Sequence, residues 1–360
     1  MHRLAIAAVL AGCRWHFADR PVDAAADAAP LALACNTPVK LGDAPLGGKL
    51  TAAATTSAII AAWIEPDGHL ATGGADFVAP LEVVGRVGVD PGDTNYTAVA
   101  TTAAGDTIIS AYTHDAMNYV ELLDPQLVTL AGPTPVPVGV LGPRGIVVTG
   151  LTGGPIAAVS GNDMGTNRAE LLAVHNDGTV SPPFDNGNVN TLTTIANVGD
   201  RLAIVDIPPT NTCEVKTADL AVTSRTLAVN WGTAGQCTEG TLAYSPGRSD
   251  ALLVRHDLTD GDLNHVIATR SGLNYTIPGE NLIKKPSDQP RPVGVADGYW
   301  VSYETAGTLE AVHVSFAGII GTPVALGALA DPTAHETVIH GTDAYAIWVQ
   351  DGLELARLCP

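Results

Sequence analysis

Short apolar segments recur along the chain, and each is bounded by turn-forming residues. They are rich in Ala, Val, Ile and aromatic residues, and turn dipeptides such as Asp67-Gly68, Asp260-Gly261 and Asp351-Gly352 follow several of them. Runs of this kind are typical of β-strands that end in tight turns. The segments span residues 57–68, 105–115, 153–163, 199–209, 248–261, 296–307 and 342–352. The pattern predicts an all-β fold.

The seven segments repeat with a nearly constant period. Aligning them brings seven bulky residues into one column, and successive members are 45 to 49 residues apart: Trp63, Tyr112, Val159, Val205, Val254, Tyr303 and Trp348. A period of this length is typical of one four-stranded blade. Blades cover both faces of each other, which explains the long apolar runs. We expect the four aromatic residues to form core between blades, and the Ala-rich runs 51–57 and 97–103 to be innermost strands.

Residues 35–360 resemble a seven-bladed β-propeller of four-stranded blades. The chain matches no single propeller family, because repeated Trp-Asp dipeptides, kelch Gly-Gly pairs and Asp-boxes are missing. A two-sheet sandwich, or a propeller with six or eight blades, is the alternative. A period sustained seven times favours the seven-bladed ring.

The two ends of this region look like one hairpin cut at its turn. The segments 35–42 and 357–360 together match the hairpin at 120–132, which reads VELLDPQLVTLAG. We therefore expect an N-terminal strand, residues 37–42, to complete the last blade as its outermost strand.

The five cysteines are Cys13, Cys35, Cys213, Cys237 and Cys359. No CxxC pair or His/Cys cluster accompanies them, which argues against a zinc site. The expected closure places Cys35 beside Cys359, close enough for a disulfide. Cys213 and Cys237 flank the outer hairpin of the fourth blade and are expected to pair with each other.

The N-terminus reads MHRLAIAAVLAGC, with a basic start and an apolar run from Leu4 to Leu10. This run is far shorter than the ~20 residues that a membrane-spanning helix needs. The residues Leu10-Ala11-Gly12-Cys13 resemble the lipobox of bacterial lipoproteins. The resemblance implies a signal peptide at 1–12 and lipidation of Cys13, which would anchor the protein to a membrane. An ordinary secretion signal with an incidental cysteine is the alternative.

Residues 13–34 comprise the lipidated cysteine and a segment rich in Ala, Asp and Pro, which is expected to be a flexible tether. The residue directly after Cys13 is Arg14 and not Asp. In enteric bacteria, a lipoprotein without Asp at this position is associated with the outer membrane. We therefore expect an exported protein anchored to the cell envelope, at the outer membrane.

Composition narrows the function classes further. The chain has 18 Lys and Arg against 37 Asp and Glu, for a formal net charge of −19. Nucleic-acid binding needs a positive footprint and is therefore not expected. The 38 Gly and 25 Pro argue against long helices, and the 46% apolar content argues against disorder.

Polar residues at the starts of the expected inner strands are the candidate ligand site. They surround the axial opening of a propeller: Asn95, Tyr96, Arg144, Glu239, Arg291, His335 and Glu336. Two Arg and a His around one funnel suit an anion or a sugar. His335 in particular is expected to line the channel. The alternative is that these residues are ordinary polar loop ends.

Other motifs carry little chemistry. His335 and His340 are five residues apart, whereas the zinc-protease motif needs four on a helix. The acidic stretch with Asp257, Asp260, Asp262 and Asn264 is a weak calcium candidate, and an acidic hairpin turn is the favoured interpretation. No other metal site is expected, and no cofactor is expected, because glycine-rich nucleotide-binding motifs are missing.

These observations favour a monomeric, lipid-anchored propeller that acts as a non-catalytic binding or scaffold module. Its expected partners are the membrane and a glycan or envelope protein. The alternative is an extracytoplasmic enzyme acting on a glycan, either a lyase or a glycosidase. A glycosidase would need two carboxylates about 5–10 Å apart, and Glu239 and Glu336 are the candidate pair.

Overall fold

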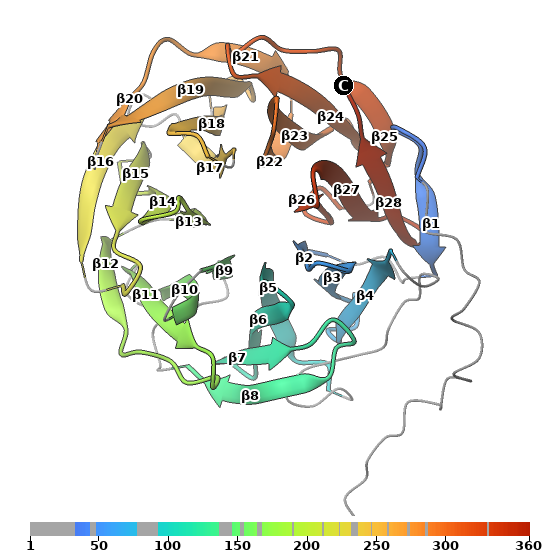
Figure 1. The fold of residues 1–360 in the computed structure, drawn as a ribbon, viewed down its shortest axis with the longest axis vertical. Helices are drawn as coiled ribbons and strands as arrows, with labels where there is room; N and C mark the ends of the chain where they lie inside the picture. Colours follow the sequence, from blue (N-terminus) through green and yellow to red (C-terminus); the bar gives the residue numbers. More distant parts are fainter. Residues whose placement is uncertain are drawn as a thin grey trace, which may run out of the picture.

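The computed structural model describes residues 33–43, 48–77, 93–136, 146–151, 155–163, 168–188, 191–210, 212–222, 224–231, 237–245, 247–257, 259–271, 274–284, 287–329 and 331–360. Seven antiparallel sheets within these ranges surround a central axis as the blades of a propeller (Figure 1). No helix in the described ranges is long and apolar enough to cross a membrane. The seven-bladed, all-β prediction is confirmed, whereas the predicted signal peptide and the predicted lipidation site, Cys13, lie outside the described residues.

Each blade runs from its innermost to its outermost strand in chain order, except the last. The strands are, in blade 1, β2 (Leu50–Ala54), β3 (Ala58–Ile64) and β4 (Leu70–Asp76); in blade 2, β5 (Tyr96–Ala104), β6 (Thr107–His114), β7 (Met117–Leu123) and β8 (Thr129–Pro135); in blade 3, β9 (Ile146–Gly150), β10 (Pro155–Asp163), β11 (Arg168–His175) and β12 (Phe184–Asn188); in blade 4, β13 (Thr191–Asn197), β14 (Leu202–Ile207), β15 (Cys213–Ala218) and β16 (Arg225–Trp231); in blade 5, β17 (Cys237–Tyr244), β18 (Asp250–Asp257), β19 (Leu263–Ser271), β20 (Asn274–Thr276) and β21 (Asn281–Lys284); in blade 6, β22 (Asp288–Val295), β23 (Gly298–Thr305), β24 (Thr308–Ser315) and β25 (Val324–Ala328); and in blade 7, β26 (His335–His340), β27 (Asp343–Val349), β28 (Leu353–Leu358) and β1 (Val39–Gly42).

The ring closes at a seam, which we define as the pairing of β1 with β28. Val39 lies opposite Leu355 in this antiparallel pair. The disulfide Cys35–Cys359 covers its end, with a Cα–Cα distance of 5.4 Å. Asn36 adds two hydrogen bonds of 3.0 Å with the backbone of Cys359, one donated and one accepted. The predicted N-terminal strand and its disulfide are therefore confirmed.

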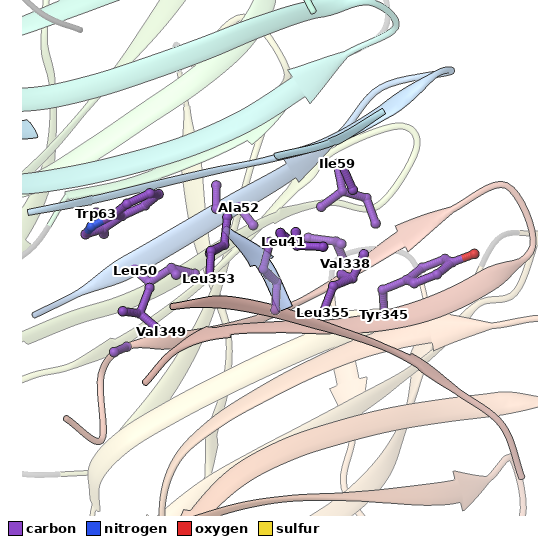
Figure 2. Close-up of a cluster of buried hydrophobic side chains, with 14 of the residues drawn as sticks. Leu41, Leu50, Ala52, Ile59, Trp63, Val338, Tyr345, Val349, Leu353 and Leu355 are labelled. Carbon is purple, nitrogen blue, oxygen red and sulfur yellow. The ribbon is translucent and has the colours of Figure 1, made fainter. Parts of the chain in front are cut away.

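The hydrophobic core lies between blades. Beneath the seam, Leu41 of β1 joins Leu353 and Leu355 of blade 7 and Trp63 of blade 1 in one buried cluster (Figure 2). Trp63 packs closely on Gly73, where an added Cβ would lie 3.3 Å from the indole ring. The aromatic residues of the repeat are all buried, as predicted: Trp63, Tyr112, Tyr303 and Trp348. Both faces of a blade therefore serve as core.

The alignment of the repeat is wrong by one residue in blades 4 and 5. The four aromatic residues pack against the preceding blade. Val205 instead packs against Leu242 of the following blade, and Val254 packs against Val301 of the following blade. Since successive residues of a strand point to opposite faces, a slip of one residue exchanges the two sides.

The residues equivalent to the aromatics are therefore the next along each strand, Asp206 in blade 4 and Arg255 in blade 5. Both are buried. Asp206 Oδ2 accepts a 2.6 Å hydrogen bond from Lys216, whereas Arg255 donates to Asp257 and to Glu280. A buried charge interrupts the apolar pattern of the repeat, so the pattern in blades 4 and 5 points to the neighbouring valines, Val205 and Val254.

The second predicted disulfide, Cys213–Cys237, is also present. Cys213 begins β15 and Cys237 begins β17, so the bond joins blade 4 to blade 5. A Cβ added at Gly240 would lie 2.7 Å from Cys213 Sγ. Only glycine leaves room for the disulfide at this position.

Candidate functional site

The inner strands enclose a cavity on the propeller axis, with a volume of about 390 Å³. All seven blades contribute residues to its wall, most of them from the first half of an inner strand. Small side chains such as Ala100 and Thr51 leave this space open near the axis. The volume lies within the range of about 300–1,000 Å³ that is usual for small-molecule sites.

Arg291 of β22 is the centre of the polar wall. Its Nη1 donates to Glu239 Oε1 at 2.8 Å, and its Nη2 donates to Gln289 Oε1 at 2.8 Å. Its Nε lies 3.8 Å from Glu336 Oε2. The guanidinium is therefore held between two carboxylates from the neighbouring blades 5 and 7.

Electrostatics in the cavity follow from burial and from these contacts. Burial raises the pKa of Glu336, and Arg291 offsets part of this effect. Burial works against the charged form of Arg291, but Glu239 and Glu336 outweigh it and raise the pKa of Arg291. Arg291 thus stays charged, and Glu336 takes up a proton at a higher pH than an ordinary glutamate does.

Lys49, just before β2, brings a second cation to this wall. Burial and the nearby charge of Arg291 lower its pKa to about 8. Glu239 and Glu336 act in the opposite direction. With Lys49 protonated, two cations face two carboxylates, so the formal charge of the group is zero.

Blades 2, 3 and 4 give the other side of the cavity a different chemistry. Its wall is apolar apart from threonines, and consists of Ala100, Thr101, Ile146, Val147, Val148, Thr194 and Ile195. The cavity therefore has a charged side and an apolar side.

Several polar atoms of the wall have no hydrogen-bond partner among the described residues. These are Oε2 of Glu239 and the hydroxyls of Thr51, Thr101 and Thr241. The three threonines are more than nine-tenths buried. Buried polar groups are normally paired, so these atoms keep unused hydrogen-bonding capacity beside the cavity.

The structure brings together three of the seven predicted site residues, Glu239, Arg291 and Glu336. Asn95 is exposed before β5, and Tyr96 is buried against the rings of Tyr112 and His114. These two residues do not line the cavity.

His335 is fully buried and does not line the cavity, so the expectation of a channel-lining His335 is wrong. Its Nδ1 lies 3.0 Å from the carbonyl oxygen of Pro332. Burial and Arg291 lower its pKa to about 3, so the ring is neutral. It starts its strand one residue before Glu336 and therefore points to the opposite face.

Two further residues complete the account of the predicted site. Arg144 lies outside the described residues. Lys49 was missed by the sequence analysis, although a lysine directly before an Ala-rich inner strand, in a chain with few lysines, is a usable signal.

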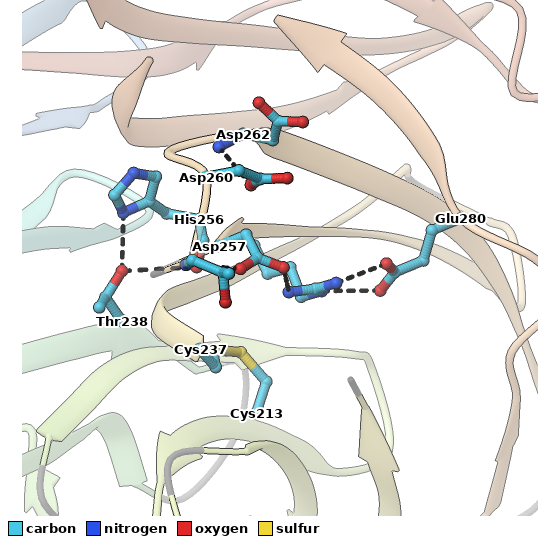
Figure 3. Close-up of polar contacts among 10 residues, drawn as sticks. Cys213, Cys237, Thr238, His256, Asp257, Asp260, Asp262 and Glu280 are labelled. Carbon is cyan, nitrogen blue, oxygen red and sulfur yellow. Dashed lines mark hydrogen bonds and ion pairs between the residues drawn. A yellow bond between two sulfur atoms is a disulfide. The ribbon is translucent and has the colours of Figure 1, made fainter. Parts of the chain in front are cut away.

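The weak calcium candidate is a hairpin turn of blade 5 (Figure 3). Asp257 accepts a 2.7 Å hydrogen bond from Arg255 and a 2.8 Å bond from the amide of Thr259. Asp260 accepts from the amide of Asp262. Asp257 is thus part of an internal ion pair, and calcium binding by the set stays a prediction.

Comparison with known proteins supplies a fold but no family. No family model and no curated protein matches the chain. Solved structures do match: the BP39L lectin from Burkholderia pseudomallei is 13% identical, with 88% of this chain and 100% of that chain covered and a TM-score of 0.65. The SapL1 lectin in complex with alpha methyl fucoside is 13% identical, with 81% and 98% covered and a TM-score of 0.52.

An enzyme shares the same architecture. Hydrazine synthase from Kuenenia stuttgartiensis is 12% identical, with 88% of this chain and 97% of that chain covered and a TM-score of 0.60. At such identities the likeness shows the fold alone, because propellers host unrelated functions. The chain is a seven-bladed β-propeller with a polar axial cavity.

Proposed function

We propose that this propeller is a non-catalytic carbohydrate-binding protein that holds its ligand in the axial cavity. The observation that carries the proposal is the wall formed by Arg291, Glu239, Glu336 and Lys49, next to threonine hydroxyls without partners.

A polyhydroxylated, uncharged ligand suits this wall best. Sugar hydroxyls both donate and accept hydrogen bonds, so they can pair with carboxylates, a guanidinium and threonine hydroxyls together. A free anion would gain from Arg291 and Lys49 but would be repelled by Glu239 and Glu336. The apolar side of the cavity can meet the C–H face of a sugar ring. This balance favours a neutral glycan over an anion.

The structural neighbours suggest a first ligand to test. Two of the structures described above are lectins, and one of them holds alpha methyl fucoside. The fold is also shared with an enzyme, so the neighbours support this choice of probe without replacing the cavity as the argument.

The same geometry disfavours glycoside hydrolysis. In a glycosidase, two carboxylates face a sugar bond that lies between them. Here Arg291 lies between Glu239 and Glu336, at 2.8 Å from the first and 3.8 Å from the second. A guanidinium in that place occupies the position that the scissile bond needs.

Isothermal titration of methyl α-fucoside and a panel of neutral oligosaccharides tests the proposal. We expect the Thr51→Val/Thr241→Val double variant to weaken binding by about 5- to 150-fold, since each of the two lost hydrogen bonds is worth about 0.5–1.5 kcal/mol. Thr217→Val is the matched control, because its hydroxyl is equally buried and unpaired but lies outside the cavity.

Binding that is equal in wild type and in the double variant would exclude the axial cavity as the glycan site. Release of new reducing ends during incubation would favour the enzymatic alternative instead.

Chemical labelling of Lys49 gives an independent test of occupancy. With a pKa of about 8, roughly half of its amines are neutral at pH 8, against under about 1% for an ordinary lysine. We expect acetic anhydride at pH 8 to modify Lys49 before Lys40, whose pKa is raised by its hydrogen bond to Asp43. Peptide mass spectrometry should show that a bound glycan protects Lys49 alone. Equal labelling of the two lysines would contradict the cavity environment.

We also propose that the protein is exported and lipid-anchored at Cys13. Its four other cysteines pair with one another, which leaves Cys13 as the fifth. Palmitate labelling followed by membrane fractionation should show wild type in the membrane and Cys13→Ser free of label and soluble. An Arg14→Asp variant should keep the label and, in an enteric host, change the membrane in which it is found. Unchanged labelling of Cys13→Ser would refute the anchor.

A further inference from the structure

A separate group of ligating side chains lies in the turn between β3 and β4 of blade 1. Nδ1 of His69 lies 2.8 Å from Asp67 Oδ1 and 3.9 Å from Glu65 Oε2. One ligand atom from each residue lies within 4.8 Å of the other two. Tetrahedral ligands at about 2.1 Å from zinc are about 3.4 Å apart. The observed separations therefore bracket the spacing of three ligands on one ion.

His69 supplies a second observation that points to a ligand. The residue is 8% exposed, and its Nδ1 is buried and makes no hydrogen bond to any described group. Asp67 Oδ1 lies 2.8 Å from this nitrogen and forms an ion pair with it when the ring is protonated. A buried nitrogen without a hydrogen bond beside two carboxylates is an arrangement that a cation can complete.

The turn that carries these residues is held on both sides. The amide of Glu65 donates to the carbonyl of His69 at 2.8 Å, and the amide of Tyr96 donates to the carbonyl of Gly68 at 3.1 Å. Gly68 has a φ of +88°, and a Cβ there would lie 1.8 Å from the carbonyl oxygen of Thr94. A fixed backbone presents the three side chains with little loss of conformational freedom on binding.

Blade 2 repeats the arrangement directly beside this turn. The geometry differs in one respect: Asp93 Oδ2 lies 3.0 Å from Nε2 of His114, whereas Asp115 Oδ2 lies 4.0 Å from Nδ1, so the two carboxylates face different ring nitrogens. Together with Asp115 these residues form the other group of three that could hold a metal within the described ranges. Asp93 precedes Thr94, which touches Gly68, so the two groups are neighbours on one face of the ring.

We propose that the turns of blades 1 and 2 form two neighbouring sites for a divalent transition metal of the zinc type. One imidazole and two carboxylates serve each ion, with Glu65, Asp67 and His69 at one site and Asp93, His114 and Asp115 at the other. An imidazole ligand suits zinc and disfavours calcium and magnesium, which prefer oxygen. Three protein ligands leave one tetrahedral position for water or a partner molecule. The sites are independent of the axial cavity.

Zinc titration of the full, metal-stripped chain without an affinity tag tests the proposal. By calorimetry and native mass spectrometry we expect two zinc ions per chain. His69→Gln and His114→Gln should each remove one ion, and the double variant should remove both. Asp67 has a side chain that is 56% exposed, so Asp67→Asn should fold normally and weaken its site by at least about tenfold.

His313→Gln is the matched control, because His313 faces a single carboxylate, Asp297 at 3.3 Å. It should bind two zinc ions as wild type does, and excess calcium should displace neither. Thermal unfolding without metal checks that each variant is folded. The proposal is overturned if wild type binds no zinc, if zinc binding is unchanged in His69→Gln, His114→Gln and Asp67→Asn, if His313→Gln loses as much zinc, or if calcium competes.

Discussion

At the strand position where blades 1, 2, 6 and 7 bury an aromatic side chain against the preceding blade, blades 4 and 5 bury a charge. The aromatic blades flank the seam, and the charged blades lie on the opposite side of the ring (Figure 1). Each side also has one disulfide, Cys35–Cys359 at the seam and Cys213–Cys237 between blades 4 and 5.

The two sides gain their stability differently. A buried aromatic removes about 150–250 Å² from water and contributes directly to the free energy of folding. A buried ion pair contributes little net, because desolvation offsets the attraction, yet it is costly to break. The disulfide of blades 4 and 5 therefore crosses the junction where Arg255 takes the place of the aromatic side chain of the repeat.

Removing the seam strand should have the largest effect. Deleting residues 35–42 removes β1, its disulfide and the cover of Leu353 and Leu355, so unfolding should occur at a much lower temperature than in Cys359→Ser. Loss of the bridge alone should cost about 6 kcal/mol on chain-entropy scaling, given the sequence separation of 324. Calorimetry of the two variants and wild type measures both steps. Equal midpoints for all three would show that the seam does not hold the ring.

Next come substitutions that separate aromatic from ionic packing. Trp348→Ala should destabilise by about 3–5 kcal/mol through the cavity that it leaves. Lys216→Met should cost about as much, because it removes the cation whose 2.6 Å hydrogen bond neutralises the fully buried Asp206. Denaturant unfolding measures both variants.

Rescue distinguishes the two cases. The double variant Lys216→Met/Asp206→Leu should regain wild-type stability or exceed it, since an apolar pair avoids the desolvation cost. A double variant as unstable as Lys216→Met would mean that the ion pair itself stabilises blade 4.

The smallest effect is expected from the disulfide opposite the seam. Cys213→Ser should cost about 3 kcal/mol, because the bond closes a sequence separation of 24. Adding a reducing agent to Cys213→Ser should then lower its stability only by the contribution of the remaining disulfide, Cys35–Cys359. A loss larger than that of Cys359→Ser would reverse the ranking of the two sides.

Much of this fold could be predicted from the sequence, because each blade is formed by one contiguous repeat of the chain. The period gave the number of blades, and the unmatched ends near Cys35 and Cys359 gave the closure. The alignment of blades 4 and 5 with the other blades was wrong by one residue, because Val205 and Val254 are apolar whereas the equivalent residues, Asp206 and Arg255, are charged. Charge pairing between strands, which makes Asp206 a core residue, is visible only in three dimensions.

The candidate site was predicted in part for a related reason. Glu239, Arg291 and Glu336 lie at strand starts, which the repeat locates. Which of these starts share a wall depends on how blades stack and on side-chain direction, so His335 was placed on the wrong side. The group around His69 gives no distinctive signal in the sequence, because carboxylates next to a histidine are common in turns.

The seam also means that β1 is synthesised long before the strand with which it pairs. Val39 pairs with Leu355, so its partner is made only after some 300 further residues have been added. At about 5–20 residues per second, that interval is about 15–60 s. During it β1 is an unpaired strand beside six growing blades, and pairing with the wrong edge must be avoided. The strand that turns an open stack of sheets into a ring, β28, therefore emerges after the strands of the other six blades, and a ribosome that stalls before Leu353 would release a chain that cannot close.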